Sequence, residues 1–531
     1  MFLKNIGVYF KGYKFSIILI LLLIVISLKP ISFTFSRPIV LGAVSVFFLY
    51  SILVFNRFHI LIAVLFAILI SLDAYFAYTF SEYINIGFFA SMVETNITEA
   101  VSMLATAWLP SLIIFTILFP LFCLSAKELK NGKIAFKYLL SSFGLTIILI
   151  GIIYKMGFDR EGLNRYSKEC PMLVFHNLVH TYTPLLYGDI AAAMAYYDDM
   201  KRFENFKKSS LRSLPQGVKW EGNETAPEKI FLIIGESAFR NHLSLYGYGE
   251  PTTPFLDSLC AAKDVQLKYY EGIAGANITR NALRMMLSFA TANQMDLFYK
   301  NKSLVDMARD AGYQTVWISN QGHSSLDDTF IGYLSSSADT TYFQNDTFFK
   351  SNDLDLLPPL KELIKPNEKQ FIVLHIVGSH GDYKDRIDET DCQRIESANK
   401  QYRDYDRSIH HTDRFLREVY QIAECQEDYL IYYTSDHGEE PGVGHGFKGN
   451  RRQFDVPMVT INNSSAPIDA TMMKYIDIET NLLSNINTIY ILGEIMGYSI
   501  QDNRFEGIID DAMYIFHSDH SVGHYQDIPR Y

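Results

Sequence analysis

DYLIYYTSDHGE, residues 428–439, joins an apolar run to an abruptly polar ending. Residues 428–435 are rich in aromatic and aliphatic side chains, which predicts a buried strand. Asp436 and His437 follow directly after that strand. A carboxylate oxygen and an imidazole nitrogen together suit Zn²⁺, although a histidine in such a place is often purely structural. The stretch therefore predicts a strand that carries two metal-type side chains at its end.

Other apolar runs have the same form. KIFLIIG (229–235) and QFIVLHIVG (370–378) are predicted strands, SLVDMARDAGYQTVWIS (303–319) a helix, turn and strand, and 396–421 a long helix. Alternation of strands and helices predicts an α/β domain with a mostly parallel sheet sandwiched by helices. Ligands in that architecture gather at the carboxyl ends of the strands.

Further metal-type residues lie in or after these predicted strand ends. Glu236 follows the first strand, where it could bind a metal, act as a base or cap the following turn. His380 stands in GSHGDY, and His445 stands in the glycine-rich GVGHGFKG. Each residue alone is weak support, but their shared position after strands predicts a single metal centre.

The segment ANITRNALRMMLSFAT (276–291) places Thr279 just before a helical pattern. A hydroxyl there can be a plain N-cap. It can also be a nucleophile, because a helix N-terminus stabilises the phosphate group that it would attack, and a metal would activate it. The sequence alone leaves both roles open.

The first 160 residues are far more apolar than the average of 49% hydrophobic and 20% charged residues. Spanning a bilayer takes about 20 apolar residues. Five transmembrane helices are predicted, at 14–34, 38–55, 58–79, 104–126 and 138–157. Lysines before the first span and between the last two predict a cytoplasmic N-terminus, so the odd number of spans places the remainder outside.

Charge and cysteine content exclude some function classes. A net charge of −11 without a basic stripe argues against nucleic acid as a partner. The five cysteines include no CxxC pair, which disfavours a cysteine zinc site. Four cysteines beyond the apolar segments allow three pairings, of which Cys392–Cys425 is disfavoured by the long helix predicted between them.

These patterns predict four regions. Residues 1–158 are a transmembrane domain with five helices, and 159–228 are aromatic-rich interfacial helices and a linker. Residues 229–511 are the catalytic domain. Residues 512–531, which contain His517, His520 and His524, are expected to be a surface tail without chemistry.

Several longer stretches carry a family likeness. GESAFRNHLSLYGYGEPTTPFLD (235–257), YDRSIHHTDRFL (405–416), DHGE and the later GHG, in this order, resemble the phosphoethanolamine transferases of Gram-negative bacteria. That family includes lipid A-modifying and colistin-resistance enzymes and belongs to the alkaline-phosphatase/sulfatase superfamily. The resemblance covers nearly the whole chain, and implies five N-terminal spans followed by an alkaline-phosphatase-like domain.

The resemblance also implies roles for individual residues. Zinc, as one or two ions, would be bound by Glu236, Thr279, Asp436 and His437, with Thr279 as the nucleophile that becomes phosphorylated. His380 and His445 would form a second, substrate-side pair that donates protons or binds another zinc. Substrate contacts would come from Glu99 in SMVETNITEA (91–100) and from Asn320, Gln321 and His323.

Some positions differ from the family pattern. Ser91 stands where an asparagine is frequent, and Arg284 and Met285 stand in place of a final Pro-Cys. The lysine that the colistin-resistance enzymes place near the phosphate is not evident after WISNQGHSS (317–325). In these respects the chain looks more like the core-sugar branch of the family.

The expected function follows from this resemblance. The chain would transfer phosphoethanolamine from phosphatidylethanolamine to lipopolysaccharide (lipid A or a core sugar) or another periplasmic glycan, through a zinc-activated threonine and a covalent phospho-threonine. It would be a multi-pass monomer in a bacterial inner membrane, with its catalytic domain in the periplasm. The alternatives are a phosphoglycerol transferase and a non-catalytic envelope lipid-binding protein. A sulfatase is disfavoured because no Cys/Ser-x-Pro-x-Arg pattern occurs in the nucleophile segment.

Overall fold

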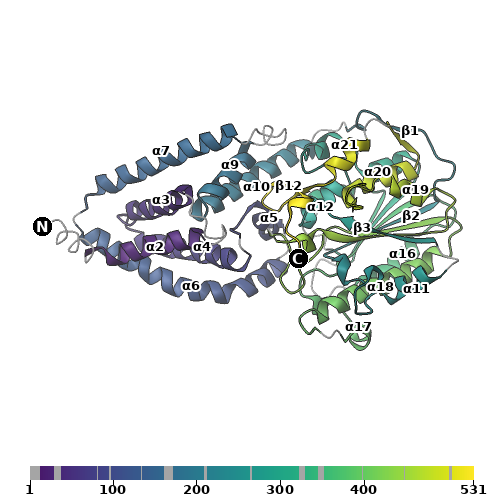
Figure 1. Cartoon of the computed structure of the whole chain (residues 1–531), viewed down its shortest axis with the longest axis horizontal. Coiled ribbons are helices and arrows are strands. Elements are labelled where there is room, and N and C mark those ends of the chain that lie inside the picture. The colour runs from purple at the N-terminus through teal and green to yellow at the C-terminus, as the bar shows by residue number, and fades with distance from the viewer. Residues whose placement is uncertain are drawn as a thin grey trace. The chain divides into compact units, whose positions relative to one another are not determined.

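The computed structural model shows two compact units, Met1–Arg202 and Phe203–Tyr531, each considered by itself (Figure 1). It describes residues 12–28, 37–80, 82–94, 97–132, 134–160, 171–207, 212–262, 266–321, 329–344, 352–396, 399–447, 449–501 and 505–531.

The first unit is helical. Its helices are α2 (Lys14–Leu28), α3 (Arg37–Leu53), α4 (His59–Thr79), α5 (Ile86–Glu94), α6 (Ile97–Asn131), α7 (Phe136–Arg160), α9 (Pro171–Tyr182) and α10 (Leu186–Lys207), the last of which runs into the second unit. A helix lies at each predicted span. Among the described residues, three stretches are long and apolar enough to cross a membrane: His59–Thr79, Ala107–Asn131 and Phe136–Met156. Helices α2 and α3 are apolar but shorter, so the structure supports three candidate spans rather than the five predicted.

The start of α2 is held by a residue far along the chain. The carboxylate of Glu128, near the end of α6, accepts hydrogen bonds from the backbone N–H of Phe15 at 3.1 Å and of Ser16 at 2.9 Å. The first N–H groups of a helix have no acceptor within the helix, and leaving them unpaired in an apolar environment is costly. Glu128 therefore serves as a cap for α2 and joins α2 to α6.

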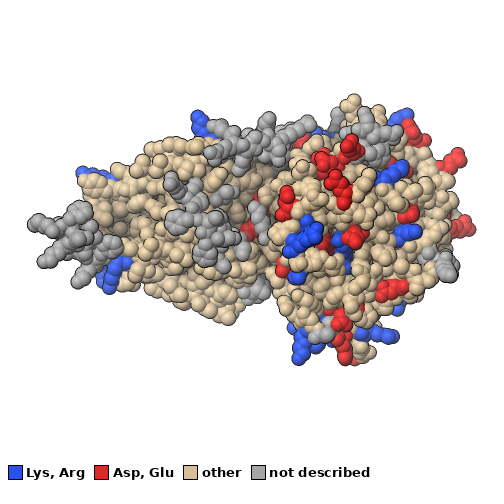
Figure 2. Space-filling view, viewed as in Figure 1, with Lys and Arg blue, Asp and Glu red and all other residues tan. Residues whose placement is uncertain are grey.

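The surface of the first unit is that of a lipid-facing bundle. Large apolar side chains such as Leu109, Ile113, Ile148 and Ile152 are more than half exposed. On the face seen in Figure 2, the described part of this unit shows almost no charged side chains, whereas the second unit shows many of both signs. Such continuous apolar exposure is typical of membrane-embedded helices.

The second unit is built on one eight-stranded sheet. In spatial order its strands are β5 (Thr340–Phe343), β4 (Gln314–Ser319), β6 (Gln370–His375), β2 (Lys229–Gly235), β7 (Tyr429–Ser435), β8 (Asp455–Asn462), β3 (Gln266–Ile273) and β9 (Leu483–Ser484). The first five are mutually parallel, as predicted. Strand β8 is antiparallel to both β7 and β3, so the sheet is mixed. Strands β3, β5, β8 and β9 were not predicted from the sequence.

Helices cover both faces of the sheet, as Figure 1 shows. On one face, α11 (Pro254–Ala261), α16 (Leu357–Leu363) and α18 (Arg403–Ala423) pack against alternate strand residues such as Ile233 and Leu374. The other face carries α19 (Ile468–Met473) and α20 (Thr488–Ile495), where the Tyr432 hydroxyl lies 3.1 Å from that of Thr488. Strand β2 is buried along its whole length, which explains its continuous apolar sequence. The remaining helices of the unit are α12 (Thr279–Met286), α13 (Leu297–Lys300), α14 (Leu304–Asp310), α15 (Phe330–Ser336), α17 (Glu389–Arg394) and α21 (Phe505–Asp511).

Two small antiparallel pairs complete the unit. Strand β1 (Val218–Trp220) pairs with β10 (Tyr498–Ile500), and β11 (Tyr514–Phe516) pairs with β12 (Val522–His524). The expectation of a surface tail at 512–531 is wrong. Ile515 and Tyr525 are buried in an apolar cluster with Ile273 of β3, and the buried Phe516 forms a β-bridge with Ala276. The apolar residues of this short segment stand among polar residues, so the sequence pattern did not indicate that the segment is buried. The described cysteines, Cys123, Cys260, Cys392 and Cys425, form no disulfide, and Cys170 lies outside the described residues.

Candidate metal centre and nucleophile

The candidate site is built where β2, β6 and β7 end side by side. Strand β2 ends at Gly235 opposite Ser435 of β7, so that Glu236 and Asp436 leave neighbouring strands at the same level. The next residue, Ser237, has a φ of 58°, a region that disfavours side chains other than glycine. Gly378, in the loop after β6, packs so closely that a Cβ there would lie 2.8 Å from the backbone oxygen of Glu236. The sheet edge and this tight loop fix the position of Glu236.

Glu236, Asp436 and His437 form a compact cluster. Each offers one ligand atom, the three atoms lie within 4.8 Å of one another, and all three residues are buried. Nε2 of His437 lies 3.2 Å from Oε1 of Glu236 and 3.4 Å from Oδ2 of Asp436. The structure thus brings together three of the predicted metal ligands, from the ends of β2 and β7.

The donor atoms of this cluster are oriented for a cation. Nδ1 of His437 lies 2.8 Å from the carbonyl oxygen of Gly438, so a hydrogen bond donated there leaves Nε2 with its lone pair facing the carboxylates. Oδ1 of Asp436 accepts hydrogen bonds from the backbone, including the N–H of His437 at 2.6 Å. Its buried Oδ2 accepts none from the described residues. Such a buried oxygen without a hydrogen bond, beside a second carboxylate, fits a Zn²⁺ site with oxygen and nitrogen ligands.

Electrostatics point the same way. Burial, together with the charge of Glu236, raises the pKa of Asp436 well above its usual range. Burial alone would lower the pKa of His437, but the two carboxylates raise it to about 10. Burial also opposes ionisation of Glu236, yet the nearby His437 charge holds the pKa of Glu236 well below its usual range. The cluster therefore attracts positive charge, which a proton or a metal ion can supply.

Thr279 lies at this cluster and not in a capping role. It is the first residue of α12, and the N-cap position is Ile278, without a side-chain capping bond. The Thr279 hydroxyl donates to Oε2 of Glu236 at 3.1 Å and lies 3.3 Å from Nε2 of His437. Two of the three metal-type residues thus touch the hydroxyl, and Thr279 does not cap α12.

The histidine pair lies beside the same carboxylate. Three ligand atoms, one from each of His380, His445 and Glu236, lie within 4.8 Å of one another. Nδ1 of His445 lies 2.7 Å from Oε2 of Glu439, whose other oxygen accepts from the Tyr383 hydroxyl at 2.7 Å. The sequence assigned no role to Glu439, although its place in DHGE was visible. It orients His445 as carboxylates orient catalytic or ligating histidines.

The predicted substrate-binding residues have different positions. Nε2 of Gln321 donates to Oε2 of Glu236 at 3.3 Å, so Gln321 reaches the cluster. The amide of Asn320 instead donates to Asp353 at 2.7 Å in the buried interior. Glu99 falls in the first turn of α6, in the other unit, and neither its side chain nor His323 is among the described parts of the chain.

Asn485 connects the nucleophile segment to the metal strand. It is fully buried in the short 3-10 helix Asn485–Asn487. Its side-chain oxygen accepts from the N–H of Gly275 at 3.1 Å, and its amide donates to the carbonyls of Ser435 and Asp436 at 3.0 Å each. Nothing in the sequence around Asn485 indicated this role, because the partners lie far away along the chain.

A second cluster of metal-type side chains consists of Asp388, Asp391 and His411. Neighbouring histidine and arginine side chains balance its negative charge. The Asp391 carboxylate lies 2.7 Å from Nδ1 of His410 and 2.8 Å from Nδ1 of His411, and accepts from Arg414 at 3.0 Å. Burial opposes ionisation, but these partners hold the pKa of Asp391 well below its usual range. The group is therefore a structural network under α18.

Comparison with known proteins fits this geometry. Residues 228–497 match the family model described as Sulfatase, which covers half of the chain. Residues 43–169 match the model described as Phosphoethanolamine transferase EptA/EptB. The chain belongs to the sulfatase family, within its phosphoethanolamine transferase branch. The predicted family is thereby confirmed.

Curated relatives carry the same name. The chain is 27% identical over 321 residues to phosphoethanolamine transferase EptC of Escherichia coli O18:K1:H7, covering 55% of this chain and 54% of that one. It is 24% identical over 468 residues to phosphoethanolamine transferase EptA of Helicobacter pylori, covering 82% of each. The match thus spans about half the length of the first of these relatives.

Solved structures share the fold. The integral membrane lipooligosaccharide phosphoethanolamine transferase A of Neisseria meningitidis matches with a TM-score of 0.63 and 18% identity, over 92% of this chain and 95% of that one. The C-terminal periplasmic domain of EcEptC from Escherichia coli, in a structure described as a complex with Zn, matches with a TM-score of 0.51 and 24% identity, over 60% of this chain and 98% of that one.

Proposed function

We propose that this protein transfers phosphoethanolamine from phosphatidylethanolamine to a lipopolysaccharide sugar or phosphate, or to another glycan, outside the cytoplasmic membrane. The observation that carries the proposal is the Thr279 hydroxyl, 3.1 Å from Glu236 and 3.3 Å from His437. A threonine beside two buried carboxylates and a histidine suits a phosphoryl-transfer nucleophile. The names of the relatives support the choice of the transferred group.

The first half-reaction forms a covalent intermediate. Oγ1 of Thr279 forms a bond to the phosphorus of phosphatidylethanolamine, and the bond from phosphorus to the glycerol oxygen breaks. The hydroxyl proton passes to Glu236, which already accepts its hydrogen bond. Diacylglycerol leaves after its oxygen takes a proton from His380 or His445. Phosphoethanolamine remains on Thr279, at the start of α12, where the helix N-terminus favours the negative charge.

The second half-reaction reverses these roles. An acceptor hydroxyl or phosphate oxygen loses its proton to His380 or His445 and forms a bond to phosphorus. The bond to Oγ1 of Thr279 breaks, and the threonine regains its proton. Gln321, which donates to Glu236 at 3.3 Å, is placed to contact the phosphoryl group in both steps.

Zn²⁺ would be held by Glu236, Asp436 and His437 together with Thr279, and a second ion would fit Glu236, His380 and His445. Bound there, zinc makes the threonine hydroxyl more acidic and offsets charge on the phosphoryl oxygens. The structure of EcEptC described as a complex with Zn supports this metal. Five apolar helices would anchor a monomer in a bacterial inner membrane: α2, α3, α4, α6 and α7. The domains would be residues 1–158, 159–228 and 229–511, with the active site on the periplasmic side. Glu99 would assist binding of the lipid headgroup.

The test uses the full-length protein in nanodiscs with phosphatidylethanolamine labelled in the headgroup. Label should appear on Thr279 by mass spectrometry of tryptic peptides, and Thr279→Ala should carry none, whereas Thr279→Ser should retain part of it. Label taken up from phosphatidylglycerol instead would identify a phosphoglycerol transferase. A zinc-loaded protein that takes up neither headgroup would be a non-catalytic lipid-binding protein.

A further inference from the structure

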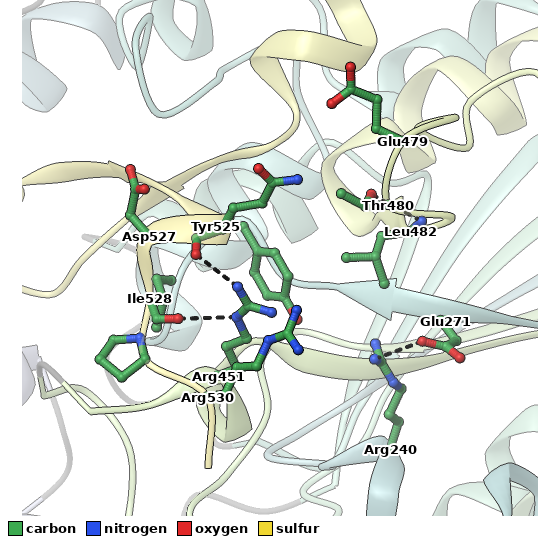
Figure 3. A pocket seen from close by; sticks show the side chains of 12 residues that line it. Arg240, Glu271, Arg451, Glu479, Thr480, Leu482, Tyr525, Asp527, Ile528 and Arg530 are labelled. Atoms are coloured by element: carbon green, nitrogen blue, oxygen red, sulfur yellow. Dashed lines mark hydrogen bonds and ion pairs between the residues drawn. The ribbon is translucent and has the colours of Figure 1, made fainter.

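A second polar cavity lies in the catalytic unit, apart from the metal centre. Its volume is about 730 Å³, within the roughly 300–1,000 Å³ typical of ligand pockets. None of the predicted metal ligands is among the described residues that line it. Figure 3 shows side chains from three parts of the unit around it: Arg240 and Glu271, Glu479 and Thr480, and the C-terminal segment with Tyr525 and Arg530.

The cavity lies along the same sheet edge as the active site. Strand β8 starts at Asp455, and because it is antiparallel to β7 this start lies at the edge where β7 delivers Asp436 and His437. Strand β3 ends at Ile273 opposite Asp455, shortly before Thr279. Arg240 likewise follows Glu236 by four positions. Both walls of the cavity are thus continuous with segments that carry site residues.

The C-terminal segment fixes the far wall of the cavity. Nε of Arg451 donates to the carbonyl of Ile528 at 3.1 Å, and its guanidinium lies over the Tyr525 ring at 4.5 Å. The Tyr525 and Tyr531 hydroxyls both donate to Asp455, the latter at 3.3 Å. These contacts make a preformed wall, which lowers the entropy lost when a ligand binds.

The charges of the lining define the ligand. The lining contains three arginines (Arg240, Arg451 and Arg530) and three carboxylates (Glu271, Glu479 and Asp527), so it is balanced in charge. Arg240 is engaged by Glu271 at 3.0 Å, whereas the exposed Arg530 guanidinium makes no hydrogen bond or ion pair with the described residues. A free guanidinium suits a phosphate, and carboxylates suit the hydroxyl groups of a sugar. A balanced set favours a hydroxyl-rich ligand with one acidic group over a polyanion or an acyl chain.

We propose that this cavity is the acceptor subsite and binds a phosphorylated saccharide, with Arg530 on its phosphate and Glu479 on its hydroxyls. This proposal rests on the proposed function, because only a transferase with a glycan acceptor has a need for such a ligand. It places the saccharide beside the segments that lead to Thr279, so the same sheet edge serves donor and acceptor.

Binding is tested on the zinc-loaded full-length protein with glucose 6-phosphate as the probe, by saturation-transfer NMR. The probe should bind, and Arg530→Ala and Glu479→Gln should each weaken it about tenfold, the loss expected for one charge-assisted hydrogen bond. Both side chains are exposed, so neither change disturbs the core. The matched control is Arg417→Ala on α18, an exposed arginine paired with Glu418 outside the cavity, which should bind as wild type does.

Unchanged affinity in both variants would overturn the proposal. Displacement of the probe by inorganic phosphate at equal concentration would also overturn it, because it would indicate an anion site without sugar recognition. In the nanodisc assay, the ratio of the acceptor step to the donor step should fall about tenfold in Arg530→Ala. Failure of the proposed function would appear differently, as an absence of label on Thr279 in the wild-type protein, and would leave the binding result standing.

Discussion

The carboxylate of Glu439 lies 2.7 Å from Nδ1 of His445 and is itself buried. This contact holds the ring of His445, which offers one ligand atom to the cluster with His380 and Glu236. Glu439→Gln should keep the fold and lower transfer about 10- to 100-fold, the usual effect of losing a carboxylate behind a catalytic or ligating histidine. Steady-state transfer rates and zinc content per chain would measure it. A rate equal to that of wild type would show that His445 needs no such partner.

Asn485 offers a second test with a built-in control. Asn485→Ala removes three hydrogen bonds between the Gly275 segment and the end of β7, so Thr279 should lose its alignment and the rate of label transfer to it should fall at least about tenfold. Asn487 belongs to the same 3-10 helix and is equally buried, but its amide atoms make no hydrogen bond with the described residues. Asn487→Ala should lose less stability and keep the rate, with KM for the lipid donor unchanged in both. Equal rate losses in the two variants would reduce Asn485 to a structural role.

The unpaired oxygen of Asp436 predicts opposite effects on function and stability. Asp436→Asn should abolish transfer and weaken zinc binding, because the amide is a poorer ligand. After treatment with a chelator, however, the variant should be more stable than wild type by about 1–3 kcal/mol, since it no longer buries two carboxylates side by side. Urea unfolding followed by tryptophan fluorescence gives the free energy of unfolding of each protein with and without chelator. A chelator-treated variant less stable than wild type would contradict the proposed crowding of charge.

Metal removal has its own expected outcome. Chelation of the wild-type protein should stop formation of phospho-Thr279 and lower the thermal unfolding temperature, and added Zn²⁺ should restore both. Mg²⁺ should restore neither, because it prefers six oxygen ligands in octahedral geometry. Activity that persists in the demetallated protein would exclude the metal-assisted mechanism.

His375 predicts a pH dependence of stability. Burial lowers its pKa to about 4, below the usual 6.5, as it sits inside β6 with Nδ1 3.3 Å from the Ser319 hydroxyl. The folded pKa is depressed, so the stabilisation is complete above pH 6.5 and is lost as pH falls toward 4, by roughly 3 kcal/mol. His375→Gln should flatten this part of the curve of unfolding free energy against pH. An unchanged slope in the variant would assign the loss to other groups.

The strand-end motifs were predictable because each joined an apolar run to a polar residue. In this way the sequence placed Glu236, Asp436 and His437 at one sheet edge, and the structure brings them within 4.8 Å of one another. Strands β3 and β8 were missed because their apolar residues are interrupted by Tyr, Lys and Glu in β3 and by Asp, Pro and Thr in β8, so neither reads as a continuous apolar run. The role of each predicted residue in catalysis stays a prediction.

Contacts between distant segments could not be predicted in the same way. Asn485 acts through partners that only folding brings near, such as Gly275, and it stands in no spacing that signals its role. Asn320 shows the converse, since a polar residue after a strand looked like a substrate contact but is held by Asp353 at 2.7 Å. The cavity at the C-terminal segment was hidden for the same reason, because its walls come from three separated stretches.

The cap on α2 has a consequence for how the protein is made. The acceptor for the backbone N–H of Ser16 comes 112 positions later in the chain, on α6. During synthesis, α2 is therefore made before its cap exists, and the amides of its first turn lack this acceptor until α6 follows. Helix α2 reaches its final hydrogen bonding only once α6 is in place, so the pairing of these two helices depends on a single glutamate.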